Sequence, residues 1–243
     1  MLDRLGTCRG CGTTRYTVRE LNICSDQVFL CYYCLDTKRR AKEMNPHIAH
    51  RDRLQAIRRR LEQPLDFPWH AHGIGMLRTY LDEAKTQRLN LWHQRMLNPG
   101  ISTMHTHPRP FVSTAYAGLM TNKIYRRVDA RAGGKAYREG IIHCGPCFKG
   151  IENDPPLVHL LLVLKTDVHP GESYRQPSRV IHDTAFEDGT ATVMEWDRFL
   201  PDECASVLWP DGESWGDATR DITVEDITVV CAAALERFNA VWS

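Results

Sequence analysis

The sequence contains no run of apolar residues approaching the roughly 20 that a membrane-spanning helix needs. Its first residues, MLDRLGTCRGCG, also lack the apolar core of a signal peptide. Hydrophobic residues make up 42% of the chain and charged residues 25%, as is usual for a soluble globular protein. We therefore expect a cytoplasmic protein that makes no contact with a membrane.

Net charge is nearly absent as well, but the charges are unevenly distributed. The formal net charge is +1 over 243 residues. Residues 1–66 contain 13 Lys and Arg against 8 Asp and Glu, whereas the remainder contains 18 against 22. Pro64 and Pro68 interrupt the pattern near this change of sign. We predict two domains, 1–66 and 67–243, with different partners, although the asymmetry is too small to establish nucleic-acid binding.

The nine cysteines are an odd number, which argues against a complete set of disulfides. Four of them form two C-x2-C pairs that enclose nineteen residues, namely Cys8, Cys11, Cys31 and Cys34. Two thiolates at this spacing can reach one ion from a tight turn, and four close a tetrahedron with no position open to water. The pattern predicts a structural zinc site. Cys24 is a fifth thiol that could replace one of the four ligands.

The surroundings of these cysteines support a small zinc-binding module. The segment between the pairs has the composition of a short hairpin, and a helix-forming run follows Cys34. This order resembles a treble-clef zinc finger over about the first 45 residues. The lack of histidine before Cys31 disfavours nuclease activity. A basic helix is expected over about 47–64, with either a solvated or a phosphate-binding face, so the module is a candidate contact for nucleic acid or protein.

Most of the sequence beyond residue 67 predicts short strands. The HAH segment 70–72 lies between a Pro and two Gly residues and is expected to be a loop, and 75–87 has the apolar spacing of a helix. Strands are expected at 89–97, 101–107, 111–118, 123–128, 157–166, 178–184 and 190–196. Their close succession without helices predicts a sandwich or barrel. A last helix is expected over about 224–241, with Thr223 and Asp226 forming its cap.

Two histidines, His105 and His107, stand one residue apart in a run that is expected to form a strand. Alternate residues of a strand face the same side, so both imidazoles can face one point. Imidazole is a common ligand of transition metals. The spacing therefore raises the question of a metal ion and of what completes its coordination.

Two spaced motifs carry a resemblance to a known family. Residues 105–118 read H-x-H-x3-F-x6-G, and residues 171–182 read G-x5-P-x4-H. Both resemble the signature motifs of the cupin superfamily, in which the first motif has Glu where this chain has Phe111. The second family motif has Gly where this chain has Arg179. The resemblance covers residues 89 to about 200, including a long insertion between the motifs.

The resemblance implies a mainly β fold, a cupin-like jelly-roll barrel with flanking helices. In that family the motifs lie on facing strands, so that His105, His107 and His182 would hold a metal inside the barrel. Phe111 cannot donate a lone pair, which leaves the fourth ligand position open. Three neutral imidazoles suit Fe, Zn, Cu or Ni. A barrel that has lost its metal is the alternative.

Other residues are candidates for the same cavity. Tyr174 and Gln176 alternate on the approach to the second motif's histidine, and Arg179 could face a substrate anion. These three are the predicted catalytic residues, although each could also lie at the rim. Trp92 and Tyr116 are expected to be aromatic residues of the core.

The segment HCGPCFKG at 143–150 contains the Cys-Gly-Pro-Cys arrangement of thioredoxin-like proteins. That mechanism needs the first cysteine at a helix N-terminus, where the dipole lowers its pKa. The residues that follow, FKGIENDPP, cannot continue as a helix of useful length. We expect a tight loop here, with a second metal knuckle that includes His143 as the less favoured alternative.

Two functions follow from these patterns. The favoured one is a metal-dependent cupin-type enzyme that resembles mononuclear non-haem iron dioxygenases, oxidoreductases in which three histidines would anchor Fe(II). Without a carboxylate ligand the ion keeps more positive charge, which favours a small anionic substrate such as a thiolate, enolate or carboxylate. The alternative is a non-catalytic module that binds a small molecule or nucleotide, with the zinc finger docking on nucleic acid or protein. Metal content distinguishes the two.

Overall fold

In the computed structural model the described residues are the strand segments 4–7, 14–19 and 29–31 together with 46–98, 100–144, 155–196, 203–213 and 220–243. The chain divides into two compact units, Met1–Leu54 and Gln55–Ser243. This division falls within helix α2 (Pro46–Glu62). The domain boundary at residue 66 stays a prediction.

The first unit contains a three-stranded antiparallel sheet of order β1-β2-β3. Its strands are β1 (Arg4–Thr7), β2 (Thr14–Arg19) and β3 (Phe29–Cys31). The antiparallel pairing of β2 with β3 agrees with the hairpin expected between the cysteine pairs. Cys8, Cys11, Cys24 and Cys34 lie outside the described residues, as does the side chain of Cys31. The structural zinc site stays a prediction.

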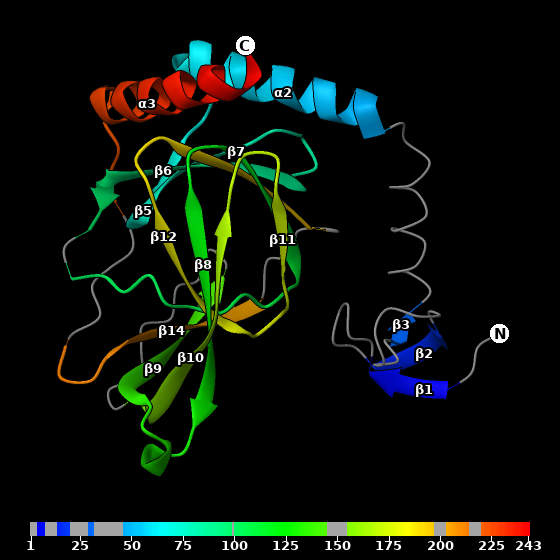
Figure 1. Cartoon of the computed structure of the whole chain (residues 1–243), viewed down its shortest axis with the longest axis vertical. Helices are drawn as coiled ribbons and strands as arrows, with labels where there is room; N and C mark the ends of the chain where they lie inside the picture. The colour runs from blue at the N-terminus through cyan, green and yellow to red at the C-terminus, as the bar shows by residue number, and fades with distance from the viewer. Residues whose placement is uncertain are drawn as a thin grey trace. The chain divides into compact units, whose positions relative to one another are not determined.

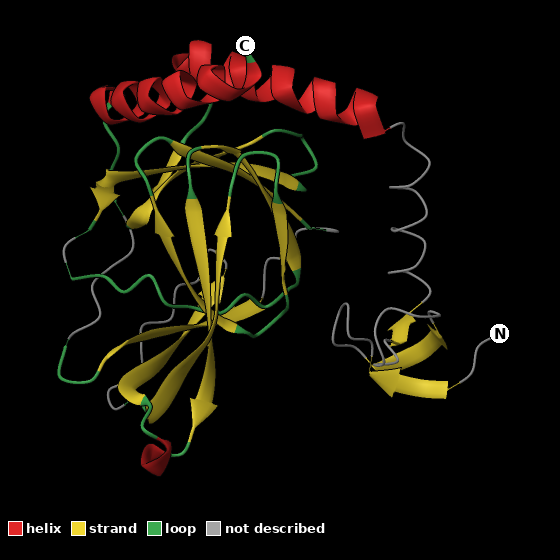
Figure 2. Cartoon of the chain, in the orientation of Figure 1, coloured by secondary structure: helices red, strands yellow, loops and turns green. Residues whose placement is uncertain are grey.

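The second unit is mainly β, as predicted, and its strands form two antiparallel sheets flanked by helices (Figures 1 and 2). The six-stranded sheet has the order β11-β7-β13-β6-β5-β4, and the five-stranded sheet has the order β12-β8-β10-β9-β14. The two sheets include one curled half-barrel, so the fold is jelly-roll-like (Figure 1). The longer helices are α2 and α3 (Val224–Trp242), and the 3-10 helices are η1 (Pro64–Asp66) and η2 (Ala130–Ala132).

Each of the two sheets is made of the following strands. The six-stranded sheet consists of β4 (His70–His72), β5 (Ile74–Tyr80), β6 (Gln87–Leu97), β7 (Phe111–Ala117), β11 (Ser173–Gln176) and β13 (Thr190–Glu195). The five-stranded sheet consists of β8 (Met120–Val128), β9 (Lys135–Cys144), β10 (Leu157–Val168), β12 (Ile181–Phe186) and β14 (Glu203–Pro210).

The two faces of the six-stranded sheet pack against different partners. Trp92 and Met76 face the five-stranded sheet, where they share a core cluster with Met120. Leu89 and Leu91 alternate with these residues and are fully buried on the opposite face, which α3 covers (Figure 1). Burial on both faces produces near-continuous apolar runs in the strands.

Helix α3 begins at the capping box that the sequence predicts. The Thr223 Oγ accepts a hydrogen bond from the Asp226 backbone N–H over 3.0 Å, and the Thr223 backbone N–H donates to Asp226 Oδ2 over 3.1 Å. Arg95 of β6 donates from Nε to Asp226 Oδ1 over 2.6 Å. Since the Asp226 side chain is buried, this pair fixes the start of α3 against the sheet.

Asp226 gives a pH-dependent contribution to stability. The hydrogen bond from Arg95 is the main reason why the pKa of this carboxyl falls from 3.8 to about 2. A lowered pKa stabilises the folded chain above about pH 4, and the contribution is lost as pH falls toward 2. Allowing for solvent around Arg95, we expect Asp226→Asn to lower the free energy of unfolding at pH 7 by about 1 kcal/mol.

Denaturant unfolding of the variant and the wild type between pH 2 and 7 measures this effect. Glu225→Gln is the matched control, because Glu225 pairs with the same arginine but its side chain is 73% exposed. The stability loss of Asp226→Asn should shrink toward pH 2. A loss that is equal at pH 2 and pH 7 would contradict the role of the ion pair.

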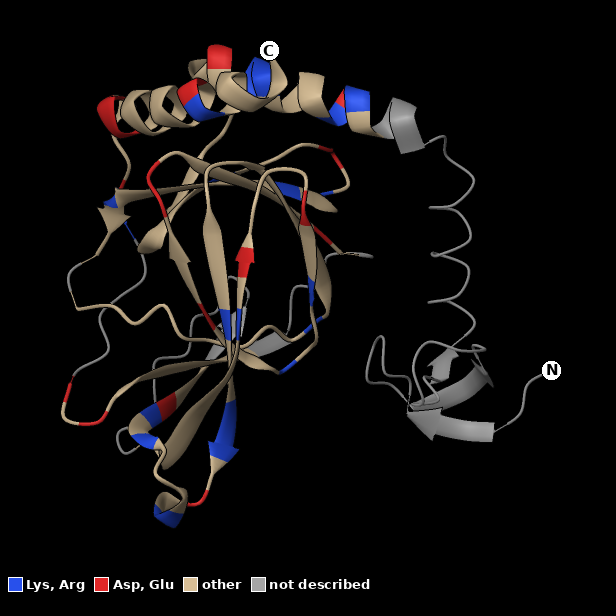
Figure 3. Cartoon of the chain, viewed as in Figure 1, with Lys and Arg blue, Asp and Glu red and all other residues tan. Residues whose placement is uncertain are grey.

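The basic helix α2 has defined contacts at its C-terminal end. Arg58 donates from Nη2 to the Trp242 carbonyl over 2.9 Å, and Arg60 donates from Nε to the Tyr80 carbonyl over 3.2 Å. Figure 3 shows the basic residues of this helix in blue. Burial lowers the pKa of Arg60, as does the charge of Arg59. These contacts hold the helix on the fold, which supports a structural role for two of the arginines that were candidates for phosphate contacts.

Three local predictions are wrong. Residues 75–87 are not a helix, because β5 occupies Ile74–Tyr80 and is buried on both faces, so its apolar residues are adjacent as well as alternate. Residues 70–72 form strand β4 and not a loop. Residues 101–107 lie in the connection before β7, where His105 makes only isolated β-bridges. Strands β9, β11 and β14 of the second unit were not predicted.

The remaining predicted elements agree with the structure. The predicted strands from 89 onward, apart from 101–107, correspond to β6, β7, β8, β10, β12 and β13. Trp92 and Tyr116 are buried core aromatics as expected, with exposed fractions of 6% and 1%. Cys144 ends β9, and the rest of the Cys-Gly-Pro-Cys segment lies outside the described residues. None of the helices in the described ranges combines the length and apolarity needed to span a bilayer.

Candidate metal centre

The three histidines of the two motifs come from two places in the chain. His105 and His107 lie in the connection between β6 and β7, and His182 is the second residue of β12. The backbones of His105 and His182 exchange two hydrogen bonds of 2.9 Å each, in an isolated antiparallel bridge. A second bridge joins His105 to Val207 of β14. The connection is therefore held between two strands of the five-stranded sheet.

The connection is extended at this point, so alternate side chains face the same side. Thr106 is buried between the histidines, donates its backbone N–H to the Ser206 carbonyl and accepts from the Ser206 N–H. The His107 carbonyl accepts from the backbone N–H of Arg179 over 2.7 Å. The expected convergence of His105 and His107 is present, although only single bridges replace the expected strand.

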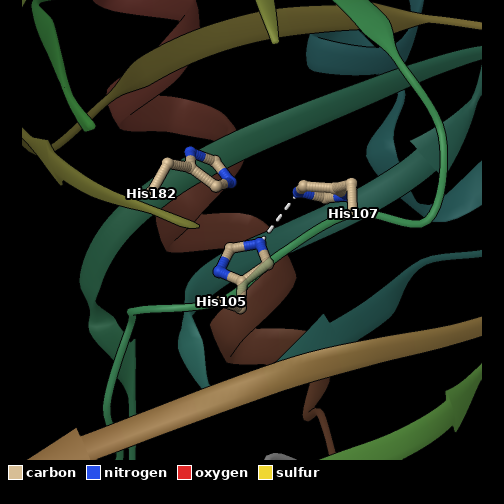
Figure 4. Close-up of side chains that lie close together, drawn as sticks. All are labelled: His105, His107 and His182. Atoms are coloured by element: carbon tan, nitrogen blue, oxygen red, sulfur yellow. Dashed lines mark hydrogen bonds between the residues drawn. The ribbon is translucent and has the colours of Figure 1, made fainter. Parts of the chain in front are cut away.

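The three imidazoles face one another (Figure 4). Ring centroids lie 4.6 Å apart for His105 and His107, 4.5 Å for His105 and His182, and 5.1 Å for His107 and His182. One ring nitrogen from each residue lies within 4.8 Å of the other two. Within the described residues, this is the group of His, Cys, Asp or Glu side chains close enough to hold a metal ion.

The distances between the nitrogens suit one ion. The Nε2 atoms of His105 and His107 lie 2.9 Å apart. Two nitrogens bound at about 2.1 Å and at right angles are about 3.0 Å apart, and two on opposite sides of an ion are about 4.2 Å apart. All pairs lie within 4.8 Å, so a small ring rotation brings the three nitrogens within reach of one ion. The geometry fits a divalent metal.

Hydrogen bonds at the far side of two rings determine which nitrogen carries the lone pair. The Nδ1 of His105 lies 2.8 Å from the Thr103 carbonyl oxygen, which can only accept, so Nδ1 is protonated. The Nδ1 of His182 lies 2.9 Å from Asn122 Oδ1. The His182 Nε2 is buried and has no hydrogen-bond partner among the residues that the structure describes. Both Nε2 atoms thus carry the lone pair, and that of His105 accepts a 2.9 Å hydrogen bond from His107 Nε2, which a bound metal would replace.

Burial keeps the three imidazoles neutral. It is the largest cause that lowers the pKa of His105, and it lowers the pKa of His107 and His182 well below the usual 6.5. His105 and His182 also disfavour a positive charge on His107, and His105 does so on His182. A metal ligand must be the neutral imidazole, because a protonated ring has no lone pair. At pH 7 the site therefore presents three neutral donors.

Phe111 occupies the side of the site where the family motif places a carboxylate. It is the first residue of β7 and is 6% exposed. Its ring centroid lies 4.6 Å from that of His107 and 6.3 Å from that of His182. A phenyl ring offers no lone pair and excludes water. The described residues therefore offer three potential ligands and an apolar wall.

The three predicted pocket residues have different surroundings. Tyr174 packs 6.1 Å from the Phe111 ring, and burial raises the pKa of its phenol to about 12, so it is neutral. Gln176 is fully buried and bonds to Asn122 and not to the site itself. Arg179 is exposed, and only its backbone contacts His107. Of the three, Tyr174 is thus the residue whose side chain packs against Phe111 beside the site.

Two further residues near the site were not predicted. Asn122 of β8 bonds to His182, and nothing in the local sequence TNK indicates this contact. Arg88 of β6 lies on the same strand face as Asn90 and Trp92 and donates from Nε to Asn90 Oδ1 over 2.8 Å. Its positive charge adds to the effect of burial in lowering the pKa of His107. Asp183 acts in the opposite direction and raises the pKa of His105, so the site has charges of both signs near it.

Comparison with known proteins adds no family assignment. No protein-family model matches the chain, and no curated protein matches it. The functional argument therefore rests on the two motifs, the jelly-roll-like fold and the geometry of the three histidines.

Proposed function

We propose that the chain is a cupin-type metalloenzyme in which His105, His107 and His182 bind one divalent metal. The observation that carries this proposal is the buried Nε2 of His182, which finds no partner in the described part of the chain and lies in a cluster of three neutral imidazoles. An unsatisfied buried acceptor costs about 1–3 kcal/mol, and a bound cation would remove that cost.

Backbone conformation at the motif positions supports the relation to cupins. Gly118 ends the first motif with φ +66, and a Cβ atom there would lie 2.8 Å from the Thr190 Cα. Arg179 has φ +58 at the position where the family motif has Gly, a left-handed conformation that favours glycine. Arg179 thus adopts a conformation that the glycine of the family motif would adopt without strain.

The donor set suggests the chemistry. Three imidazoles without a carboxylate suit Fe(II), which when bound would supply O₂ activation through open ligand positions. Phe111 would keep water from one side of the site. The charge of Arg88 would favour an anionic substrate, which is the role predicted from the sequence for Arg179. The neutral phenol of Tyr174 would be available as a hydrogen-bond donor. We propose a dioxygenase that acts on a small anionic molecule.

The N-terminal module carries a separate proposal. We propose that Cys8, Cys11, Cys31 and Cys34 hold a structural zinc and that the module contacts nucleic acid or protein. Support comes from the C-x2-C spacing and the excess of basic residues in positions 1–66. The metal of the three histidines must therefore be counted in addition to this zinc.

Metal loading tests the proposed function. The full-length chain is stripped, loaded anaerobically with Fe(II), Mn(II), Ni(II) or Zn(II), and analysed by elemental analysis after gel filtration. We expect one more metal ion per chain than in a His105→Ala/His107→Ala/His182→Ala variant. Oxygen uptake with a panel of thiols, enediols and carboxylates then tests the dioxygenase.

His169→Ala is the matched control, because this imidazole is exposed in the turn between β10 and β11. It should bind as much metal as the wild type. A wild type that binds no more metal than the triple variant would overturn the metalloenzyme proposal and leave a non-catalytic binding module. Metal binding without oxygen uptake on any substrate of the panel would overturn the dioxygenase proposal and leave the proposed metal site standing.

A further inference from the structure

We infer that Asn122 and Gln176 form a directional hydrogen-bond chain that sets the tautomer of His182 and so presents its Nε2 lone pair to the metal. The inference rests on the proposed function for its purpose but not for its geometry. Both residues are positioning residues, since neither lies among the metal-ligating side chains.

The direction of the chain is set at its far end. The Val180 carbonyl oxygen can only accept, so Gln176 must present its amide Nε2–H to that oxygen, which lies 3.3 Å away. The Gln176 Oε1 then faces Asn122 and accepts from its Nδ2 over 3.3 Å. An amide has one donor end and one acceptor end, so orienting Gln176 also orients Asn122.

The near end of the chain acts on the histidine. With its Nδ2 directed toward Gln176, Asn122 presents Oδ1 to His182 Nδ1 over 2.9 Å. An amide oxygen cannot donate, so Nδ1 carries the proton. A neutral imidazole has one N–H, and Nε2 is therefore the unprotonated nitrogen. This is the atom that has no partner within the described ranges.

Burial of the three residues stabilises this tautomer of His182. Asn122, Gln176 and His182 are 3%, 0% and 2% exposed, so water does not compete for their polar atoms. The three residues also come from both sheets, since Gln176 ends β11 of the six-stranded sheet, whereas Asn122 and His182 belong to the five-stranded sheet. A polar chain in this position has to be fully paired to be tolerated. Its direction is consequently fixed by the fold.

The tautomer of His105 is set by a hydrogen bond in the same way, but without an intervening side chain. Its Nδ1 donates directly to the Thr103 carbonyl over 2.8 Å, which leaves Nε2 unprotonated. Two of the three rings thus have a fixed tautomer. A backbone carbonyl sets that of His105, and the hydrogen-bonded side chains of Asn122 and Gln176 set that of His182. Partners of this kind orient a ligand and commonly change metal affinity by about 10–100-fold when they are removed.

Nitrogen-15 NMR of the metal-free, full-length chain with labelled histidine tests the tautomer directly. We expect the His182 signals, identified by their absence in His182→Ala, to show Nδ1–H in the wild type. Asn122→Asp keeps the acceptor and should keep Nδ1–H. Asn122→Leu removes the acceptor and should shift His182 to Nε2–H. Its metal affinity should fall about 10–100-fold, whereas that of Asn122→Asp should stay within a few-fold of the wild type.

Thr184→Val is the control, since Thr184 is a buried polar residue paired with Asn122 in the β12–β8 register and stands outside the chain of amides. It should leave the tautomer and the affinity unchanged. Nε2–H in the wild type would overturn the inference, and so would Nδ1–H in a folded Asn122→Leu. If Asn122→Leu fails to fold, the wild-type signal alone decides. A wild type with Nδ1–H that binds no metal would defeat the proposed function and leave the tautomer assignment standing.

Discussion

His182→Ala is expected to lower the affinity for the metal of the barrel by more than about 100-fold. The substitution removes one of three ligands, a larger change than the loss of an outer hydrogen bond, which costs about 10–100-fold. The fold should survive, because the bonds that join residues 105 and 182 run between backbone atoms and remain possible with alanine. Titration of the stripped chain with Ni(II) or Zn(II) measures the change.

Two comparisons separate a lost ligand from a damaged fold. His169→Ala should bind as the wild type does, and the far-ultraviolet circular dichroism of His182→Ala should match that of the wild type. Alanine removes an orphaned buried nitrogen but also the donor to Asn122 Oδ1, so the metal-free variant should lose the stability of that hydrogen bond and of the small cavity that it leaves. Unchanged affinity in a folded His182→Ala would show that the metal, if bound, does not use the second motif.

The three-histidine cluster was predicted from two sources. One is the alternation of side chains in an extended segment, which brings His105 and His107 to one side. The other is the resemblance to the two cupin motifs, which implied that His182 faces them from a second strand. The prediction of a regular strand at 101–107 was wrong, but a locally extended backbone gives the same alternation.

The residues behind the cluster could not be predicted in this way. Asn122 and Gln176 are 54 positions apart and meet only because β8 and β11 belong to sheets that face each other. Arg179 was predicted to face a substrate anion in the cavity, but its side chain is exposed. Its charge and motif position motivated the prediction, but the backbone is left-handed there, and side-chain direction at such a residue does not follow strand alternation.

The helix predicted at 75–87 failed for a related reason. Apolar residues at helical spacing also arise in a strand that is buried on both faces, and β5 is such a strand. Its inner residue Met76 packs toward the five-stranded sheet, and Leu77 is fully buried. Only the tertiary context, a sheet covered by helices on one face and by a second sheet on the other, distinguishes the two cases.

Phe111→Glu is expected to tighten metal binding by at least about tenfold, which corresponds to about 1.4 kcal/mol. The Phe111 ring faces His107 at 4.6 Å, so a carboxylate in its place lies beside the histidine nitrogens and supplies an anionic ligand to the cation. Without metal the same carboxylate is buried and unpaired, which costs stability or raises its pKa. Added metal should therefore raise the melting temperature of this variant more than that of the wild type.

Phe111→Gln separates the charge from the change of shape, because glutamine has nearly the same size as glutamate and no negative charge. We expect it to gain little metal affinity and to show a melting shift on metal addition close to that of the wild type. If substrate needs the position that Phe111 leaves open, oxygen uptake should fall in the Glu variant and less in the Gln variant. Equal metal affinities of the two variants would place Phe111 away from the ion, and the open ligand position would then lie on another side of the three imidazoles.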